Sequence, residues 1–150
     1  YLAFGPLTGK LNPLAPPLDI QNENGVVIGH VNFGDAYEGP PGHVHGGYVA
    51  AVFDELLGVA QGFSGEPGVT GTLTVRYRRP TPLHTKLRLE GSFDRVEGRK
   101  IFTTGEMYPN GELTADATGL FIKIPLEHYE AMKQSSVALR EQRGSRKATE

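Results

Sequence analysis

A glycine-rich helix start followed by a carboxylate pair is the part of the sequence that could do chemistry. The run 40–55 holds a proline–glycine turn, a His-Gly-Gly element at 45–47, and an almost wholly apolar stretch that ends at Asp54 and Glu55. Glycines at a helix start expose backbone N–H groups to a ligand. A carboxylate in an apolar helix is costly unless it is paired or used. We therefore expect a donor for a developing oxyanion at the helix start, and a base or nucleophile at Asp54.

The spacing of Gly46 and Asp54 predicts that one chain does not complete this site. Eight residues separate them, which is about 12 Å along a helix axis at ~1.5 Å per residue, and they point to different sides of the helix. A base must come within about 3 Å of the atom it acts on, or of its water. Two antiparallel helices across a two-fold axis would pair the amide of one subunit with the carboxylate of the other. We therefore predict a homodimer with two composite sites.

Acyl transfer is the chemistry that these groups favour. The amide of Gly46 or Gly47, aided by the helix dipole, would bind a carbonyl oxygen as it gains charge. Asp54 would attack the acyl carbon or activate a water, and both roles stay open. Thr70 or Thr72, at the start of the next predicted strand, would supply a hydroxyl that assists the acid or orients the water.

Plainer interpretations of the same residues also stay open. His43 and His45 could form a metal site with Asp35, but the sequence offers no clear further ligand, and we predict no metal. Asp54 could merely pair within a core. The glycines at 46–47 could merely permit close packing of a helix on a sheet.

Length and composition predict one soluble domain. The 150 residues suffice for a core, and 38% hydrophobic with 21% charged residues is typical of globular proteins. A net charge of −2 gives no reason to expect nucleic-acid binding. No apolar run approaches the ~20 residues of a membrane span, and the lack of cysteine excludes disulfides and thiolate catalysis. We expect a cytoplasmic protein with no nucleic-acid or membrane partner, although a start at Tyr1 leaves a removed leader open.

Hydrophobic patterning predicts an α+β chain: one strand, one enclosed helix, and four further strands in an antiparallel meander. The helix is expected over 46–62 and is apolar on every face. A curved sheet on one side and a partner on the other would cover such a helix. Alternation and turn signals predict strands over residues 26–33, 70–79, 83–96, 99–108 and 112–124.

The chain divides into three predicted parts. Residues 1–24, rich in proline, form an extended arm that packs on the body. Residues 25–133 form the folded domain and close with a short helix over 126–132. Residues 134–150 are polar and charged, and we expect a flexible tail there.

The sequence also resembles a known family. His-Gly-Gly opening a long apolar helix, with Asp nine residues after the His, resembles the hotdog-fold acyl-CoA thioesterases, above all their phenylacetyl-CoA thioesterase-like branch. The runs 70–83, 96–100 and 117–123 are similar to the thioesterase superfamily member 4 proteins within that branch. The resemblance runs from about Gly25 to Ile124. It implies the hotdog fold, a curved antiparallel sheet wrapped around one long central helix.

The resemblance implies an acyl-CoA thioesterase, which hydrolyses a thioester to a carboxylic acid and free coenzyme A without a metal or redox cofactor. In that family Gly46 and Gly47 would polarise the thioester carbonyl through their amides, while His45 supports the thioester end of the substrate. Asp54 of the opposing subunit would be the nucleophile or general base. Thr70 matches the assisting hydroxyl.

Coenzyme A is implied to bind basic side chains, because positive charge suits its phosphates. The matching residues are Arg76, Arg78, Arg99 and Lys100. One departure is Gly39, where many relatives carry Asn six residues before the motif His. The resemblance to the member 4 proteins favours medium or long fatty acyl chains, and a dimer of dimers stays open.

Two other functions stay open at this point. A hotdog hydratase or dehydratase acting on acyl-CoA would need a His paired with an acid, and no such signature is evident in the loop before the helix. A non-catalytic acyl-CoA-binding regulatory module would keep the arginines but would not need Asp54.

Overall fold

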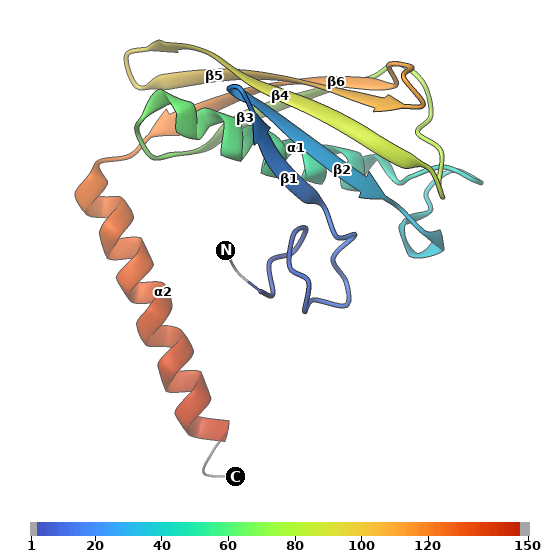
Figure 1. The fold of residues 1–150 in the computed structure, drawn as a ribbon. Coiled ribbons are helices and arrows are strands. Elements are labelled where there is room, and N and C mark those ends of the chain that lie inside the picture. Colours follow the sequence, from blue (N-terminus) through green and yellow to red (C-terminus); the bar gives the residue numbers. More distant parts are fainter. Residues whose placement is uncertain (1–2, 148–150) are drawn as a thin grey trace.

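The computed structural model describes residues 3–147, and within them an antiparallel six-stranded sheet carries one long helix, α1 (Gly46–Gln61), on one face (Figure 1). The predicted α+β class is confirmed. The strands are β1 (Asp19–Glu23), β2 (Val26–Asn32), β3 (Gly68–Tyr77), β4 (Lys86–Glu97), β5 (Lys100–Pro109) and β6 (Ala115–Lys123). Two 3-10 turns, η1 (Asp35–Tyr37) and η2 (Gly62–Ser64), lie before and after α1, and a second helix, α2 (Leu126–Lys147), follows the sheet.

The strand order is β1-β2-β4-β5-β6-β3, so the predicted four-strand meander is wrong in one respect. Strands β4, β5 and β6 do form a meander, but β3 pairs with β6 and not with β4. Pro80 and Pro82 lie in the connection after β3, where their fixed φ and missing N–H oppose a tight hairpin. The far side of β4 is taken by β2. Strand β3 therefore lies at an edge of the sheet, and its outer side pairs with no strand in the part of the chain described.

The expectation of an extended arm up to residue 24 is wrong. Most of the segment 3–14 is folded into turns, such as the one closed by the Gly9 N–H, which donates to the Gly5 carbonyl at 3.2 Å. Residues 19–23 form β1, which pairs with β2 across a tight turn at Asn24 and Gly25. Their φ values of 53° and 86° are of the left-handed kind that a two-residue hairpin turn needs. The Asn-Gly pair is the sequence signal for this hairpin.

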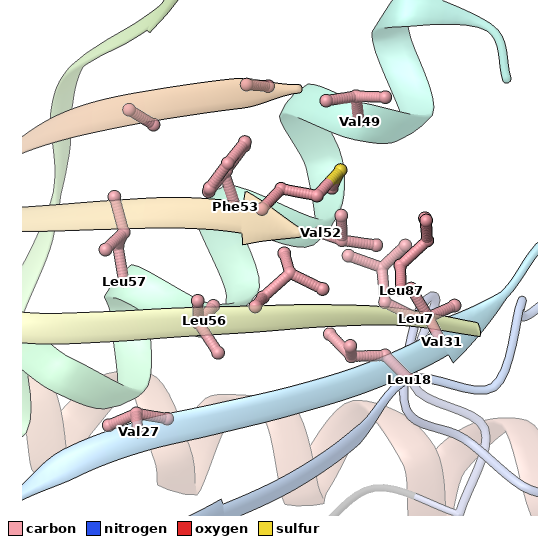
Figure 2. Packing of buried hydrophobic residues seen from close by; sticks show 14 of the residues in the cluster. Leu7, Leu18, Val27, Val31, Val49, Val52, Phe53, Leu56, Leu57 and Leu87 are labelled. Atoms are coloured by element: carbon pink, nitrogen blue, oxygen red, sulfur yellow. The ribbon is translucent and has the colours of Figure 1, made fainter. Parts of the chain in front are cut away.

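The rest of the N-terminal segment packs on the body, as predicted. Leu7 and Leu18 are buried, and Figure 2 shows them beside Val31 and Leu87 in the core. The Leu18 N–H also donates to the Leu7 carbonyl at 2.8 Å. Residues 1 and 2 of the predicted arm lie outside the described residues.

Helix α1 buries one side against the sheet. The residues that it buries are Val49, Val52, Phe53, Leu56, Leu57 and Ala60, most of them visible in Figure 2. Strand glycines allow this close approach: a Cβ at Gly91 would lie 3.0 Å from Leu56 Cγ. Tyr48, Ala51 and Val59 also pack against the core but are only partly buried. A helix that is apolar all round is thus covered on one side only by its own chain.

The prediction of a short helix followed by a flexible tail is wrong for the described residues. Helix α2 continues from Leu126 to Lys147, because the segment after Pro125 contains good helix formers and no further proline. It extends away from the sheet (Figure 1), and Met132 and Val137 are more than half exposed. Residues 148–150 of the predicted tail lie outside the described residues. Neither helix of the described chain is long and apolar enough to cross a membrane.

Candidate active site

Asp54 and Thr70 meet where α1 passes the start of β3. The Thr70 hydroxyl donates a hydrogen bond to Asp54 Oδ1 at 2.8 Å. A bulge between Thr70 and Thr72 shifts the pairing of β3 with β6 at this point, and bulges re-aim side chains in this way. The structure thus places Thr70, rather than Thr72, against the acid.

A cavity of about 490 Å³ opens beside this pair. Asp54, Glu55 and Gly58 line it from the helix, and Val69 and Thr70 line it from the edge strand. Nothing lies within 4 Å of the position that a Cβ would take at Gly58. The helix surface next to the acid is therefore open for a ligand.

Glu55 forms part of the same wall and is partly buried. Burial, and then repulsion from Asp54, raise the pKa of Glu55 above its usual value of 4.5. Folding therefore shifts this carboxyl toward its neutral form relative to the unfolded chain.

Replacing Glu55 by glutamine should stabilise the fold at neutral pH. A carboxyl whose pKa is raised on folding binds more protons when folded. Its contribution to stability is therefore lost as the pH rises from 4.5 through the raised pKa. The neutral amide avoids this loss, so the melting temperature of Glu55→Gln should exceed that of wild type at pH 7 and match it near pH 4. Glu127→Gln, an exposed change in α2, is the control. A gain equal at both pH values would contradict the assigned cause.

The helix start offers one free backbone donor. His45 caps α1, and its Nδ1 accepts the N–H of Gly47 at 2.9 Å. The N–H of Gly46, by contrast, has no hydrogen-bond partner among the described residues. The two predicted amide donors are therefore not equivalent: in this structure the amide of Gly46 is free, and that of Gly47 is used by the cap.

Tyr77 holds this helix start against the end of β3. Its hydroxyl donates to the Gly46 carbonyl at 2.7 Å, and burial raises its pKa, so it remains a donor. Gly46, Tyr77, Arg78 and Arg79 share the wall of a second cavity, of about 320 Å³. Sequence reasoning assigned no role to Tyr77. The sequence feature that could have indicated a role for Tyr77 is its position in the run Arg-Tyr-Arg-Arg-Pro, which ends the strand.

The acid and the free amide lie at opposite ends of β3. Asp54 contacts Thr70 near the first residue of the strand, whereas Gly46 contacts Tyr77 at the last. Gly46 and Asp54 are eight residues apart on α1, which is about 12 Å along the helix axis at ~1.5 Å per residue. One chain does not bring the two groups together, as their spacing predicted.

The four basic residues predicted to bind coenzyme A also lie in two separate places in one chain. Arg76 and Arg78 lie near the end of β3, and Arg78 pairs with Asp116. Arg99 and Lys100 lie at the β4–β5 turn. Lys100 is opposite Ile122 on β6, which in turn is opposite Val69 at the start of β3. All four are exposed, but one chain does not gather them into one site.

A metal site would require His43, His45 and Asp35 to face one another, but each of them contacts a different group. His43 Nδ1 contacts the Pro41 carbonyl at 2.8 Å, and Asp35 pairs with His84 Nε2 at 2.6 Å. His45 caps α1. Within residues 3–147 no group of three or more candidate ligands is arranged to hold a metal ion.

Known proteins match the part of the chain that carries this geometry. A family model described as "Thioesterase superfamily" matches residues 41–115, half of the chain. Acyl-coenzyme A thioesterase THEM4 of Xenopus laevis is 36% identical over 93 residues, which cover 61% of this chain and 42% of that protein. THEM4 of Bos taurus is 35% identical over 96 residues, which cover 63% and 39%. The chain thus spans about two fifths of the length of these relatives.

Solved structures agree on the fold. A crystal structure described as a thioesterase superfamily protein superposes with a TM-score of 0.76 at 43% identity, covering 80% of this chain and 60% of the other. A hypothetical thioesterase of Streptococcus pneumoniae TIGR4, solved with coenzyme A, superposes with a TM-score of 0.65 at 19% identity, covering 71% and 87%. At the latter identity the likeness shows the fold alone.

Proposed function

The chain belongs to the thioesterase superfamily and has its hotdog fold, and we propose that it hydrolyses acyl-CoA thioesters to carboxylic acids and free coenzyme A. The observation that carries this proposal is the hydrogen-bonded pair of Asp54 and Thr70 beside an open cavity. The free amide of Gly46 at a helix start supports it. So do the names of the relatives, which are acyl-coenzyme A thioesterases.

The site is proposed to form between two chains. The outer side of β3 is unpaired in the described chain and can pair antiparallel with β3 of a second copy. A two-fold axis near Leu73, midway along the strand, would bring Asp54 and Thr70 of one chain opposite Tyr77 and Gly46 of the other. The same pairing would place a second copy against the partly exposed side of α1, so the helix would be enclosed.

The same two-fold axis would bring together the basic residues proposed to bind coenzyme A. Arg99 and Lys100 of one chain would approach the end of β3 in the other, where Arg76 and Arg78 lie. The four basic residues that one chain keeps apart would then line one composite site and bind the phosphates of the substrate.

In the proposed reaction the N–H of Gly46 donates to the thioester oxygen as negative charge develops there. In the general-base route, Asp54 takes a proton from a water whose oxygen attacks the acyl carbon. The C–S bond then breaks, and coenzyme A leaves as a thiol with that proton. In the nucleophile route, Asp54 attacks the acyl carbon, the C–S bond breaks and coenzyme A leaves as a thiolate. Water then hydrolyses the resulting anhydride, which frees Asp54 and the carboxylic acid, and the proton released goes to the thiolate. In both routes the Thr70 hydroxyl orients the carboxylate, and no metal or redox cofactor is needed.

A panel of acyl-CoA esters of increasing chain length, with phenylacetyl-CoA included, tests the function through the release of free thiol. We expect saturable release with at least one ester. No release from any of them would overturn the proposal. Hydration of an enoyl-CoA without thiol release would instead favour the hydratase. The only His–carboxylate pair among the described residues, His84–Asp35, lines neither cavity, which weighs against that alternative.

Replacing Thr70 by valine should lower kcat about tenfold or more and leave KM nearly unchanged. The change removes one hydrogen bond to a charged group, and valine is β-branched like threonine and suits a strand. Steady-state kinetics check the effect, and Thr70→Ser, which keeps a hydroxyl, should recover most of the rate. A kcat within twofold of wild type in Thr70→Val would remove this hydroxyl from the mechanism.

A further inference from the structure

The side chain of His43 has no role in the proposed reaction, although it lies beside one end of the proposed site. It lines the cavity of about 320 Å³ that Gly46, Arg78 and Arg79 also line. The proposed function places the thioester oxygen at Gly46 and the phosphates of coenzyme A at basic residues that include Arg78. The part of coenzyme A that joins its sulfur to its phosphates would then pass through this cavity, beside His43.

The loop before α1 fixes the position of His43. The His43 N–H donates to the Pro40 carbonyl at 2.9 Å and closes a β-turn, in which Gly42 has the left-handed φ of 76° that the third position of a type II turn requires. The next residue, Val44, donates its N–H to the Thr81 carbonyl at 2.8 Å. The backbone of His43 is thus held on both sides, and a ligand would meet a preformed wall.

The ring of His43 is held in one tautomer. Its Nδ1 lies 2.8 Å from the Pro41 carbonyl, and a carbonyl oxygen only accepts hydrogen bonds, so Nδ1 carries the hydrogen. In the neutral ring Nε2 then has a lone pair and no hydrogen. Nε2 has no hydrogen-bond partner among the described residues and is not buried. The side chain therefore offers a hydrogen-bond acceptor that the protein itself leaves free.

We propose that Nε2 of His43 accepts the amide N–H of coenzyme A that lies nearest the sulfur. The inference rests on the proposed function and gives it a specificity, for thioesters of thiols that carry a secondary amide two carbons from the sulfur. The arginines of this cavity, Arg78 and Arg79, donate hydrogen bonds and cannot accept that N–H. The hydroxyls of Tyr77 and Thr81 already make hydrogen bonds within the protein. His43 is thus the acceptor that the cavity keeps for the ligand.

Methylating the amide nitrogen of the substrate tests the inference, because it removes that one N–H. The measured quantity is the ratio of kcat/KM for an N-acetylcysteamine thioester to that for its N-methyl analogue, both with the acyl group most active in the panel above. We expect a ratio of about ten or more in wild type, because methylation leaves the acceptor unpaired. The ratio should fall below about three in His43→Phe and His43→Leu, which lack the acceptor.

The ratio compares two substrates on the same protein, so a general loss of active enzyme does not change it. His128→Phe, the same replacement at an exposed position of α2, is the matched control and should keep the wild-type ratio. A wild-type ratio below about three, or a ratio within twofold of wild type in both His43 variants, would overturn the inference.

A binding measurement separates this inference from the proposed function. The probes are free coenzyme A and adenosine 3′,5′-bisphosphate, which has the nucleotide part of coenzyme A but no amide, and calorimetry gives their Kd values. His43→Phe should raise the Kd of coenzyme A at least fivefold and leave that of the bisphosphate unchanged, and this result supports the role of His43 even if no thioester is hydrolysed. Hydrolysis with equal coenzyme A affinity in wild type and His43→Phe, and with equal amide preference, overturns the role of His43 and leaves the hydrolase proposal standing.

Discussion

Asp54→Asn is expected to lower kcat for acyl-CoA hydrolysis by about a thousandfold, because positioned general bases contribute about 10²- to 10⁴-fold. Asparagine has nearly the same shape, and its amide oxygen can still accept the Thr70 hydroxyl that now lies 2.8 Å from Asp54 Oδ1. It can neither take a proton from water nor attack the acyl carbon efficiently. The loss should therefore fall on kcat and leave the geometry of the site in place.

Substrate binding is the control for this variant. The basic residues assigned to coenzyme A are exposed and lie on other elements, so the Kd of free coenzyme A, measured by calorimetry, should match wild type. The melting temperature should match it as well. A kcat above about one tenth of the wild-type value would show that Asp54 is neither base nor nucleophile.

Gly46→Pro is expected to lower kcat about 10²- to 10³-fold, the usual cost of one oxyanion donor. The change removes a single N–H that has no partner among the described residues. Proline suits the first position of a helix, and His45, at φ −58° and ψ 130°, already has the extended conformation required before proline. The fold should therefore tolerate the change while the donor is lost.

Gly46→Ala is the matched control. It keeps the N–H, and its Cβ would meet the Tyr77 ring at 3.5 Å, an ordinary contact. Its kcat should stay within a few-fold of wild type in the same assay. Equal rates in the alanine and proline variants would show that the amide of Gly46 does not stabilise the oxyanion.

Mixing the two inactive variants tests whether the site is shared. A dimer with one Asp54→Asn chain and one Gly46→Pro chain has one intact composite site and one doubly altered site. Half of the dimers in a randomised equal mixture are of this kind, so about one quarter of wild-type activity should return. If the mixture stays as inactive as its parts, both groups act within one chain.

Local sequence patterns were sufficient to predict the helix and the strands that carry the site residues. The apolar run after the His-Gly-Gly element fixed α1 to within a residue of its observed end, and alternation located β3 to β6 within a few residues. The partner of each strand could not be predicted in this way, because the pairing of β3 with β6 joins residues that are 38 to 55 positions apart, from Tyr77↔Ala115 to Gly68↔Lys123. The β1 hairpin was accessible, since Asn24 and Gly25 form a known turn signal.

The site shows the same division. Asp54 could be predicted from the sequence, because a carboxylate in an apolar helix is costly unless it is paired or functional. Its contact with Thr70 depends on a bulge that alternation does not reveal. The difference between the amides of Gly46 and Gly47 comes from the His45 cap, a matter of side-chain geometry. The role of Tyr77 comes from the return of β3 past the start of α1.

The unpaired side of β3 exposes the separate chain to aggregation before two copies associate. A ten-residue strand with bare backbone groups is a template for any other exposed strand, and so a starting point for aggregation. Its bulge and Arg76 are modest safeguards. If two copies join there, association removes the hazard in the same event that creates a working catalyst. A substitution that weakens this pairing would then expose the strand edge and lower the activity together.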